Sequence, residues 1–134
     1  MTDKIAFDLV SPERLLLSED AEMVTVPGTE GEFGVLAGHM PVISTLRPGV
    51  ISVQGGAAGD ARFFVLGGFA EVNPLKITVL AEEAIPMEQI NPAVLDQRIR
   101  NAEEDILLAK TERERARAVE FLDNLRLLRS SLRS

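Results

Sequence analysis

"ITVLAEEAIPMEQINPAVLDQRIRNAEEDILL" (residues 77–108) contains the point at which the periodicity of the chain changes. Before Asn91, apolar and polar residues tend to alternate, as they do along a β-strand with one buried face. After Pro92, apolar residues recur every three or four positions, as they do on one face of an α-helix. These residues are Leu95, Ile99, Ala102 and Ile106. We therefore predict a β domain over residues 1–87 and a helical domain over residues 88–134.

The residues before this change predict an antiparallel β-sandwich. In residues 4–10, Ile5, Phe7 and Leu9 alternate with polar or small residues, which indicates a half-buried strand. Similar short runs follow, separated by turn-forming Pro-Gly, Gly-Gly and Asn-Pro pairs. Closely spaced short strands favour a sandwich or barrel over a parallel βαβ sheet. The expected strands are residues 4–10, 14–17, 22–26, 33–36, 42–46, 50–53, 62–66, 69–72 and 75–80.

The residues after the change predict an antiparallel hairpin of two helices. Asn91 is a suitable N-cap and Pro92 is tolerated in a first helical turn. Thr111 and Glu114 match the S/T-x-x-E capping box, so we expect a second helix to begin there. The connecting turn should therefore lie near residues 109–111. The second apolar stripe consists of Ala118, Leu122, Leu125 and Leu128, with Phe121 beside it.

Charges are distributed unevenly along the chain, and they suggest how the two helices align. Residues 1–90 carry 5 basic and 13 acidic side chains, a net charge of −8, whereas residues 91–134 carry 9 basic and 8 acidic, a net charge of +1. An acidic body disfavours nucleic acid as a partner. In the hairpin, we expect the acidic residues near the end of the first helix to face the arginines that begin the second. These are Glu103, Glu104 and Asp105, and Arg113, Arg115 and Arg117.

The start and composition of the chain bear on its location. The first residues lack the pattern of a signal peptide, and no run of 18 apolar residues is present. The chain has no cysteine, which fits a reducing compartment. We therefore expect a soluble protein with no segment inserted directly into a membrane.

The glycine-rich stretch from Pro27 to Gly49 is the segment most likely to be mistaken for a catalytic loop. It lacks the lysine and hydroxyl residue of a phosphate-binding P-loop, and its glycines are spaced G-x-x-G-x-x-G rather than G-x-G-x-x-G. With His39 the only histidine and no cysteine, His-pair metal sites and cysteine nucleophiles are excluded. We therefore expect no catalytic, cofactor-binding or metal-binding residues, and no cofactor.

Two interpretations of this stretch remain open on the residues alone. His39 is either a loop histidine that lines an interface or an acid–base group, and the second use requires an orienting partner that the sequence does not reveal. Glu30 and Glu32 are either exposed carboxylates that meet cationic groups of a partner or a catalytic carboxylate pair. In both cases we favour the interface.

Several motifs resemble the epsilon subunit of F-type ATP synthase, whose mitochondrial counterpart is called delta. The most specific is Glu30-Gly31-Glu32-Phe33-Gly34-Val35-Leu36-Ala37-Gly38-His39-Met40-Pro41. It is supported by Ser11-Pro12-Glu13, Arg47-Pro48-Gly49, Phe64-Val65-Leu66-Gly67-Gly68-Phe69-Ala70-Glu71-Val72 and Thr78-Val79-Leu80-Ala81-Glu82-Glu83-Ala84. The resemblance covers essentially the whole chain and implies a sandwich of ten strands followed by a helical hairpin.

The resemblance also implies a function without catalysis. Such a subunit belongs to the rotating central stalk, where it links the membrane c-ring to the gamma subunit during ATP synthesis and hydrogen ion transport. Carried over to this chain, Glu30, Gly31 and Glu32 would meet the c-ring, whereas Ser11, His39, Met40 and Pro41 would meet gamma. The implied location is peripheral, on the cytoplasmic face of the bacterial inner membrane.

The C-terminal helices carry a further implication of the resemblance. In this family an extended tail can enter the alpha/beta catalytic head and restrain ATP hydrolysis, and here Arg126, Arg129 and Arg133 would lead it. Some members bind ATP through an [IL]-D-x-x-R-A motif, but this chain has Ile90-Asn91-Pro92-Ala93-Val94-Leu95 instead. We therefore expect no ATP binding. The alternative class is an adhesion or ligand-binding β-sandwich with a helical interaction tail.

Overall fold

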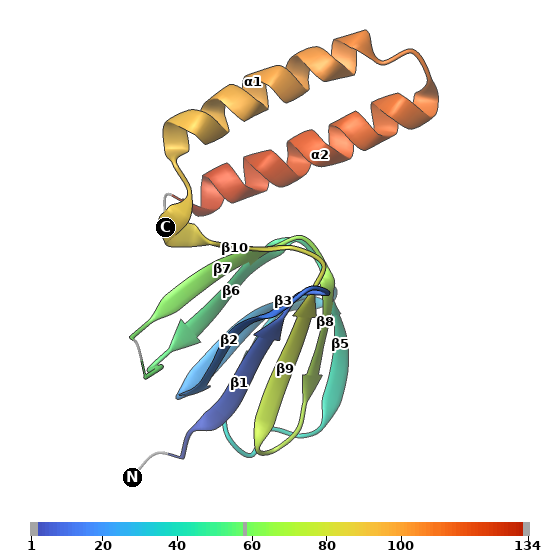
Figure 1. Ribbon diagram of the computed structural model, residues 1–134. Helices are drawn as coiled ribbons and strands as arrows, with labels where there is room; N and C mark the ends of the chain where they lie inside the picture. Colours follow the sequence, from blue (N-terminus) through green and yellow to red (C-terminus); the bar gives the residue numbers. More distant parts are fainter. Residues whose placement is uncertain (1–2, 58, 133–134) are drawn as a thin grey trace. The chain divides into compact units, whose positions relative to one another are not determined.

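The computed structural model describes residues 3–57 and 59–132 (Figure 1). The chain divides into two compact units, Met1–Glu88 and Gln89–Ser134. The first unit contains the strands and the second contains the two long helices. The predicted fold class, a β-sandwich followed by a two-helix hairpin, is confirmed.

Each of the expected strands corresponds to a strand of the structure, and one more is present. The tenth strand, β10, was implied only by the family resemblance, because three residues are too few to show a period. The strands are β1 (Ile5–Val10), β2 (Leu15–Ala21), β3 (Met23–Gly28), β4 (Gly31–Val35), β5 (Val42–Leu46), β6 (Gly49–Gln54), β7 (Ala61–Val65), β8 (Gly68–Val72), β9 (Lys76–Ala81) and β10 (Ala84–Pro86).

The strands follow the order β10-β7-β6-β3-β5-β8-β9-β1-β2, and β4 pairs with β3 outside this path. β3 joins the two halves of the sandwich, because its first residues pair with β6 and its last residue, Gly28, pairs with Leu46 of β5. β4 lies against β3 along its whole length. Beyond Gly28 the chain turns into β4, so the residues of β5 before Leu46 have no partner strand on this side.

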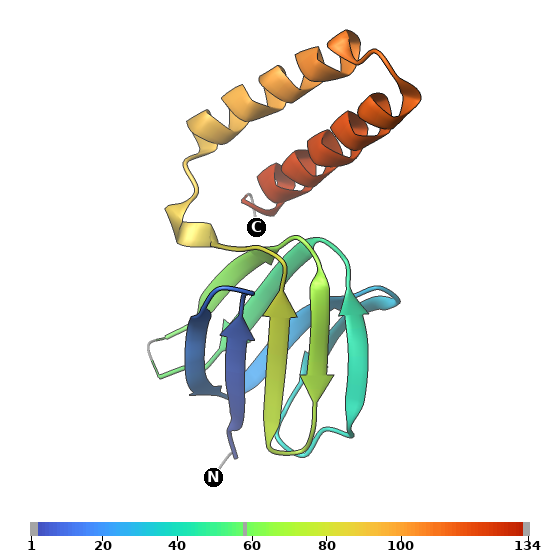
Figure 2. The same cartoon turned by 45° about the vertical axis from the view of Figure 1, so that its right-hand side comes forward.

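One pair of strands departs from the expected antiparallel pattern. β1 and β9 run parallel, with Ala6 opposite Lys76 and Val10 opposite Leu80, and Figures 1 and 2 both show them side by side. A salt bridge spans this pair, because Lys76 Nζ lies 2.8 Å from Asp8 Oδ2. Ser18 Oγ of β2 also donates to Asp8 Oδ1 at 2.7 Å. One carboxylate therefore links three neighbouring strands.

The core of the sandwich follows the alternation seen in the sequence. Ile5, Phe7 and Leu9 are fully buried, and the residues between them are partly exposed. The same side chains pack with buried residues of both halves of the sandwich, including Val26, Val53 and Val79. Burial of large apolar side chains contributes about 1.5–3 kcal/mol each. The strands are therefore held mainly by this shared apolar interior.

A short 3₁₀ turn, η1 (Met87–Gln89), crosses the boundary between the two units in the sequence, and α1 (Pro92–Leu108) and α2 (Glu112–Ser131) follow it. Asn91 caps α1 as predicted, since its side chain accepts from the amides of Ala93 and Val94. Thr111 caps α2 through the amide of Glu114 at 3.1 Å. In a capping box the Glu114 carboxylate would accept from the amide of Thr111, but here it accepts from the amide of Lys110. Both caps place the turn where the sequence predicted it.

The two helices pack through the predicted stripes, but the charges pair differently from the prediction. Leu95 and Ala102 of α1 and Leu122, Leu125 and Leu128 of α2 are buried. The predicted facing of Glu103, Glu104 and Asp105 with Arg113, Arg115 and Arg117 is wrong. Among the described residues, the ion pairs of the hairpin are Glu103–Arg126 at 3.2 Å and Asp96–Arg129 at 2.7 Å. Arg126 and Arg129 each follow a buried leucine of α2, so they lie beside the face that packs on α1 and can reach its carboxylates.

Candidate partner-binding surface

Of the predicted site residues, Glu30 lies in the turn between β3 and β4, and Gly31 is the first residue of β4. Gly28 and Gly31 form the last pair of this hairpin, and all of Glu30, Gly31 and Glu32 are exposed. Gly31 has a φ of +136°, which side chains rarely adopt. A Cβ at Gly28 would come within 2.8 Å of the Gly31 carbonyl oxygen. The tight turn therefore depends on glycine, and it presents Glu30 at its tip.

His39 and its neighbours lie in the loop between β4 and β5. The amide of His39 donates to Leu36 O at 3.1 Å, and the amide of Gly38 donates to Pro74 O at 2.7 Å, so the loop is anchored to the β8–β9 turn. Nδ1 of His39 lies 2.8 Å from Met40 O. The imidazole ring also lies 6.3 Å from the ring of Phe33, measured between centroids. These contacts hold the loop in place, and the assignment of His39 to an interface stays a prediction.

These two loops line one groove of about 730 Å³ on the sandwich. The groove contains five of the predicted site residues. Glu30 and Gly31 come from the β3–β4 hairpin, and His39, Met40 and Pro41 come from the loop that follows β4. The residues assigned to two different partners thus share one surface. Glu30 is the one residue of the lining with a formal charge, and the remainder are apolar, small or neutral polar.

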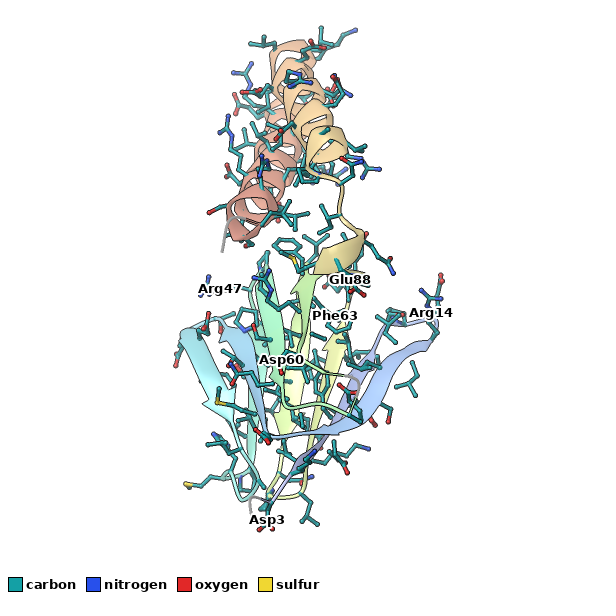
Figure 3. The ribbon with its side chains drawn as sticks, turned by 90° about the vertical axis from the view of Figure 1, so that its left-hand side faces the viewer. Asp3, Arg14, Arg47, Asp60, Phe63 and Glu88 are labelled. Carbon is teal, nitrogen blue, oxygen red and sulfur yellow. The ribbon has the colours of Figure 1, made fainter. Side chains whose placement is uncertain are left out.

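Glu32 and Ser11 do not line this groove. Glu32 is exposed on β4, opposite Pro27. Ser11 lies in the β1–β2 turn, where its amide donates to Arg14 O at 2.9 Å. Figure 3 shows Arg14 far from Arg47, whose Nε donates to Gly28 O at 3.2 Å, close to the groove. Ser11 is therefore separated from the other residues that the sequence assigned to gamma.

Sequence reasoning missed three apolar residues of the groove: Phe33, Val42 and Ile43. Met40 and Ile43 are the most exposed of the large apolar side chains in the groove, at 78% and 73%. A signal was present, because residues 42–46 were predicted as a strand, and period two places Ile43 opposite to the buried Leu46. The sequence does not show, however, whether the face of residues 42–46 that carries Ile43 is covered by another part of the chain or exposed.

The C-terminal arginines of the predicted regulatory helix lie in the hairpin. Arg126 and Arg129 both belong to α2 and both bind carboxylates of α1. Arg133 lies outside the described residues. In the closed hairpin, two of the three cations proposed to lead an extended tail are therefore already paired.

The segment that replaces the family's ATP motif forms the start of α1. Asn91 Oδ1 accepts from the amides of Ala93 at 2.9 Å and Val94 at 3.4 Å, so its side chain is used in capping the helix. Val94, at the position of the motif arginine, is an exposed apolar residue. Neither residue offers a positive charge to a phosphate.

Two features of residues 3–57 and 59–132 concern metal binding and membrane insertion. No group of three or more histidine, cysteine, aspartate or glutamate side chains is arranged to hold a metal ion. No helix in this part of the chain is both long enough and apolar enough to cross a membrane.

Comparison with known proteins assigns this combination of sandwich and hairpin to a class. The sequence model of the family "ATP synthase, Delta/Epsilon chain, beta-sandwich domain" matches residues 4–87. The ATP synthase epsilon chain of Parvibaculum lavamentivorans is 49% identical over 132 residues, covering 98% of this chain and all of that protein. The ATP synthase epsilon chain of Mesorhizobium japonicum is 43% identical over 132 residues, covering 98% of each chain.

Solved structures give the same result. A chain in the cryo-EM structure of Euglena gracilis mitochondrial ATP synthase, described as OSCP/F1/c-ring, has a TM-score of 0.84 and 27% identity, covering 96% of this chain and 81% of that one. A chain in the Tetrahymena thermophila mitochondrial ATP synthase central stalk/c-ring structure has a TM-score of 0.71 at 16% identity, so this second likeness concerns the fold alone. The chain therefore belongs to the ATP synthase delta/epsilon chain family, as its motifs indicated.

Proposed function

We propose that this chain is a non-catalytic subunit of the central stalk of an F-type ATP synthase. In this role it transmits the rotation of a proton-driven c-ring to the gamma subunit, and gamma acts on the catalytic alpha/beta head. The groove that brings Glu30 and Gly31 together with His39, Met40 and Pro41 is the observation that supports the proposal most directly. It is a preformed, largely apolar surface beside an exposed carboxylate, and such a surface suits protein partners rather than a small substrate.

We assign the two partners to two parts of this surface. The tip of the β3–β4 hairpin, with Glu30, Gly31 and the adjacent Glu32, faces the c-ring, because exposed carboxylates on a narrow hairpin complement cationic loops. Met40, Pro41 and His39 face gamma, because exposed apolar side chains gain from burial in a stable interface. Ser11 is assigned to the same partner, at a separate contact.

We also propose that the helical hairpin regulates ATP hydrolysis by opening toward the catalytic head. Opening would break the Glu103–Arg126 and Asp96–Arg129 pairs and free both arginines for new carboxylate partners. It would also expose the apolar stripes of both helices, so a replacement surface is required. A continuous helix from Ala93 to Ser131 would be about 60 Å long, at 1.5 Å per residue.

The proposal as a whole is tested by purification of an affinity-tagged version of this chain from its own bacterial membranes. We expect gamma and c subunits to accompany it at a fixed stoichiometry, together with alpha and beta. The complex should be recovered with the membrane fraction at its cytoplasmic face and released as a peripheral assembly. Recovery of the tagged chain without gamma would refute the proposal.

A further inference from the structure

One edge of β5 remains unpaired inside the groove. On one side, β5 pairs with β8 along its whole length, with Val42 opposite Val72 and Leu46 opposite Gly68. On the other side, it pairs with β3 only where Leu46 meets Gly28. The β3–β4 hairpin diverges beyond this point, and the groove lies between the hairpin and the rest of β5.

The backbone of Ile43 points into this groove. Thr29 N donates to Thr45 O at 3.0 Å, and Arg47 N donates to Pro27 O at 3.0 Å, so the backbone groups of Thr45 and Arg47 point toward β3. Backbone groups of alternate residues in an antiparallel strand point in the same direction. The N–H and C=O of Ile43 therefore point the same way, and within the described residues no strand pairs with Ile43 on that side.

Within β5 itself, this edge lacks the usual protection against pairing with another chain. Natural edge strands carry lysines, prolines, inward-pointing charges or bulges that prevent strand addition. Residues 42–44 contain none of these, and Pro41 comes just before the strand. Here the residues flanking the open edge are Met40, Val42 and Ile43, all apolar and exposed. An unpaired, apolar edge of this kind is the template used in recognition by strand addition, where backbone hydrogen bonds give affinity and alternate side chains give specificity.

We propose that an extended segment of the gamma subunit binds in the groove as an added strand on β5, hydrogen-bonded through the backbone of Ile43. This inference rests on the proposed function and specifies how that surface recognises its partner. The open stretch from Val42 to Ser44 is about 10 Å long at 3.4 Å per residue, so it accommodates about three partner residues. Those that face Ile43 and Met40 are apolar, which complements the exposed apolar side chains of this part of the groove.

Charge favours this occupant over a second copy of the chain. Glu30 is the one formally charged residue in the lining of the groove, and residues 1–90 carry a net charge of −8. A second copy would bring an equally acidic surface against the first, and like charges brought together oppose association. A gamma segment without net negative charge avoids this repulsion, and it leaves Glu30 available to the c-ring.

The test uses two substitutions at one position and measures binding to purified gamma subunit. Ile43→Pro removes the amide hydrogen that points into the groove. The hydrogen bonds to β8 use the backbone groups of the neighbouring residues Val42 and Ser44, so this substitution leaves them in place. Ile43→Thr is the matched control, because it keeps the amide and the β-branched shape. We expect Ile43→Pro to weaken gamma binding at least tenfold relative to Ile43→Thr, with both variants keeping wild-type thermal unfolding midpoints.

Amide hydrogen exchange of the unaltered chain provides a second measurement that does not depend on a variant. We expect the Ile43 amide to exchange at least tenfold more slowly in the complex with gamma than in the free chain. If gamma binds the wild-type chain but the Ile43 amide is not protected and Ile43→Pro binds like Ile43→Thr, strand addition is wrong while the proposed function stands. Protection that appears without gamma and rises with chain concentration would indicate a second copy and overturn the proposal. If gamma does not bind the wild-type chain at all, the proposed function itself fails.

Discussion

Arg129 of α2 donates from Nε to Oδ1 of Asp96 in α1 at 2.7 Å, joining residues 33 positions apart across the hairpin. Together with the Glu103–Arg126 pair, this contact fixes the alignment of the two helices. Both pairs are partly exposed, so each contributes roughly 0.2–1 kcal/mol. They are strong enough to bias an equilibrium between closed and open hairpins and weak enough for a competing partner to replace them.

Removing both carboxylates should shift the hairpin toward its open form. We predict that Asp96→Asn combined with Glu103→Gln raises the open fraction at least about twofold in the assembled enzyme, since about 0.4–2 kcal/mol of pairing is lost. The measurement is the distance between labels at Ala93 and Ser131. Glu104→Gln is the control, because Glu104 is exposed and forms no ion pair among the described residues. An unchanged closed-hairpin distance under both synthesis and hydrolysis conditions would leave the hairpin as a structural brace.

Reversing the charge at Glu32 should impair energy coupling without unfolding the sandwich. Glu32 is exposed on β4 beside the hairpin tip, so Glu32→Lys changes stability by less than about 0.5 kcal/mol. It should, however, repel cationic loops of the c-ring. We expect the ratio of proton pumping to ATP hydrolysis in membranes to fall. Glu13→Lys, in the distant β1–β2 turn, is the matched control, and equal coupling in both variants would contradict the c-ring assignment.

The isolated chain should not bind ATP. The side chain of Asn91 is used as the helix cap, and Val94 stands where the family motif has an arginine. Titration by calorimetry or amide NMR should therefore reveal no saturable binding with a Kd below about 0.1 mM, which corresponds to about −5.5 kcal/mol. Tighter saturable binding would show that another part of the chain supplies the phosphate contacts.

The contact between Asp8 and Lys76 should make stability depend on pH in the acidic range. The hydrogen bond from Lys76, followed by that from Ser18, lowers the pKa of Asp8 below its ordinary value of 3.8. The stabilisation is therefore fully present above 3.8 and is lost as the pH falls through the lowered pKa of the folded state. Urea unfolding should show the wild-type chain more stable than Asp8→Asn at neutral pH, with the difference vanishing below that pKa. A difference that persists unchanged in strong acid would refute this account.

Two glycines with positive φ should differ sharply when changed to alanine. A Cβ at Gly68, where φ is +127°, would collide with the carbonyl oxygen of Leu80 on the neighbouring β9. Gly31 has a φ of +136° but open space around it. We expect Gly31→Ala to cost roughly 1–3 kcal/mol of backbone strain and Gly68→Ala to cost more than about 4 kcal/mol. Thermal unfolding of both variants measures this, and equal losses would show that the collision is relieved by movement of β9.

The sequence predicted the elements well because their signals are local. The alternation of Ile5, Phe7 and Leu9, the Asn91 cap and the Thr111–Glu114 motif each depend on neighbours within a few positions, and the structure contains all of them. The parallel pairing of β1 with β9 joins residues about 70 positions apart, and no local pattern encodes it. The prediction for the partners of Glu103 was wrong for the same reason. Its pairing with Arg126 depends on how the two helices are rotated against each other.

The candidate site was partly predicted for a similar reason. Glu30, Gly31 and His39 stand out in the sequence because glycine-rich loops with charged residues are commonly functional. Ile43 does not stand out, because an apolar residue in a strand is normally a core residue. Ile43 lies beyond the end of β3 at Gly28, where β5 has no second partner strand, and this is a property of the tertiary fold.

The parallel β1–β9 pair also constrains how the chain folds as it leaves the ribosome. β1 is synthesised before β9, so Ala6 must wait for Lys76 before the pair can form. At about 5–20 residues per second, this interval lasts about 4–14 s. During that time β1 can pair only with β2, and the apolar face formed by Ile5, Phe7 and Leu9 remains available to chaperones or to other nascent chains. In every copy of the chain, the apolar face of β1 is therefore exposed during synthesis until β9 has been made.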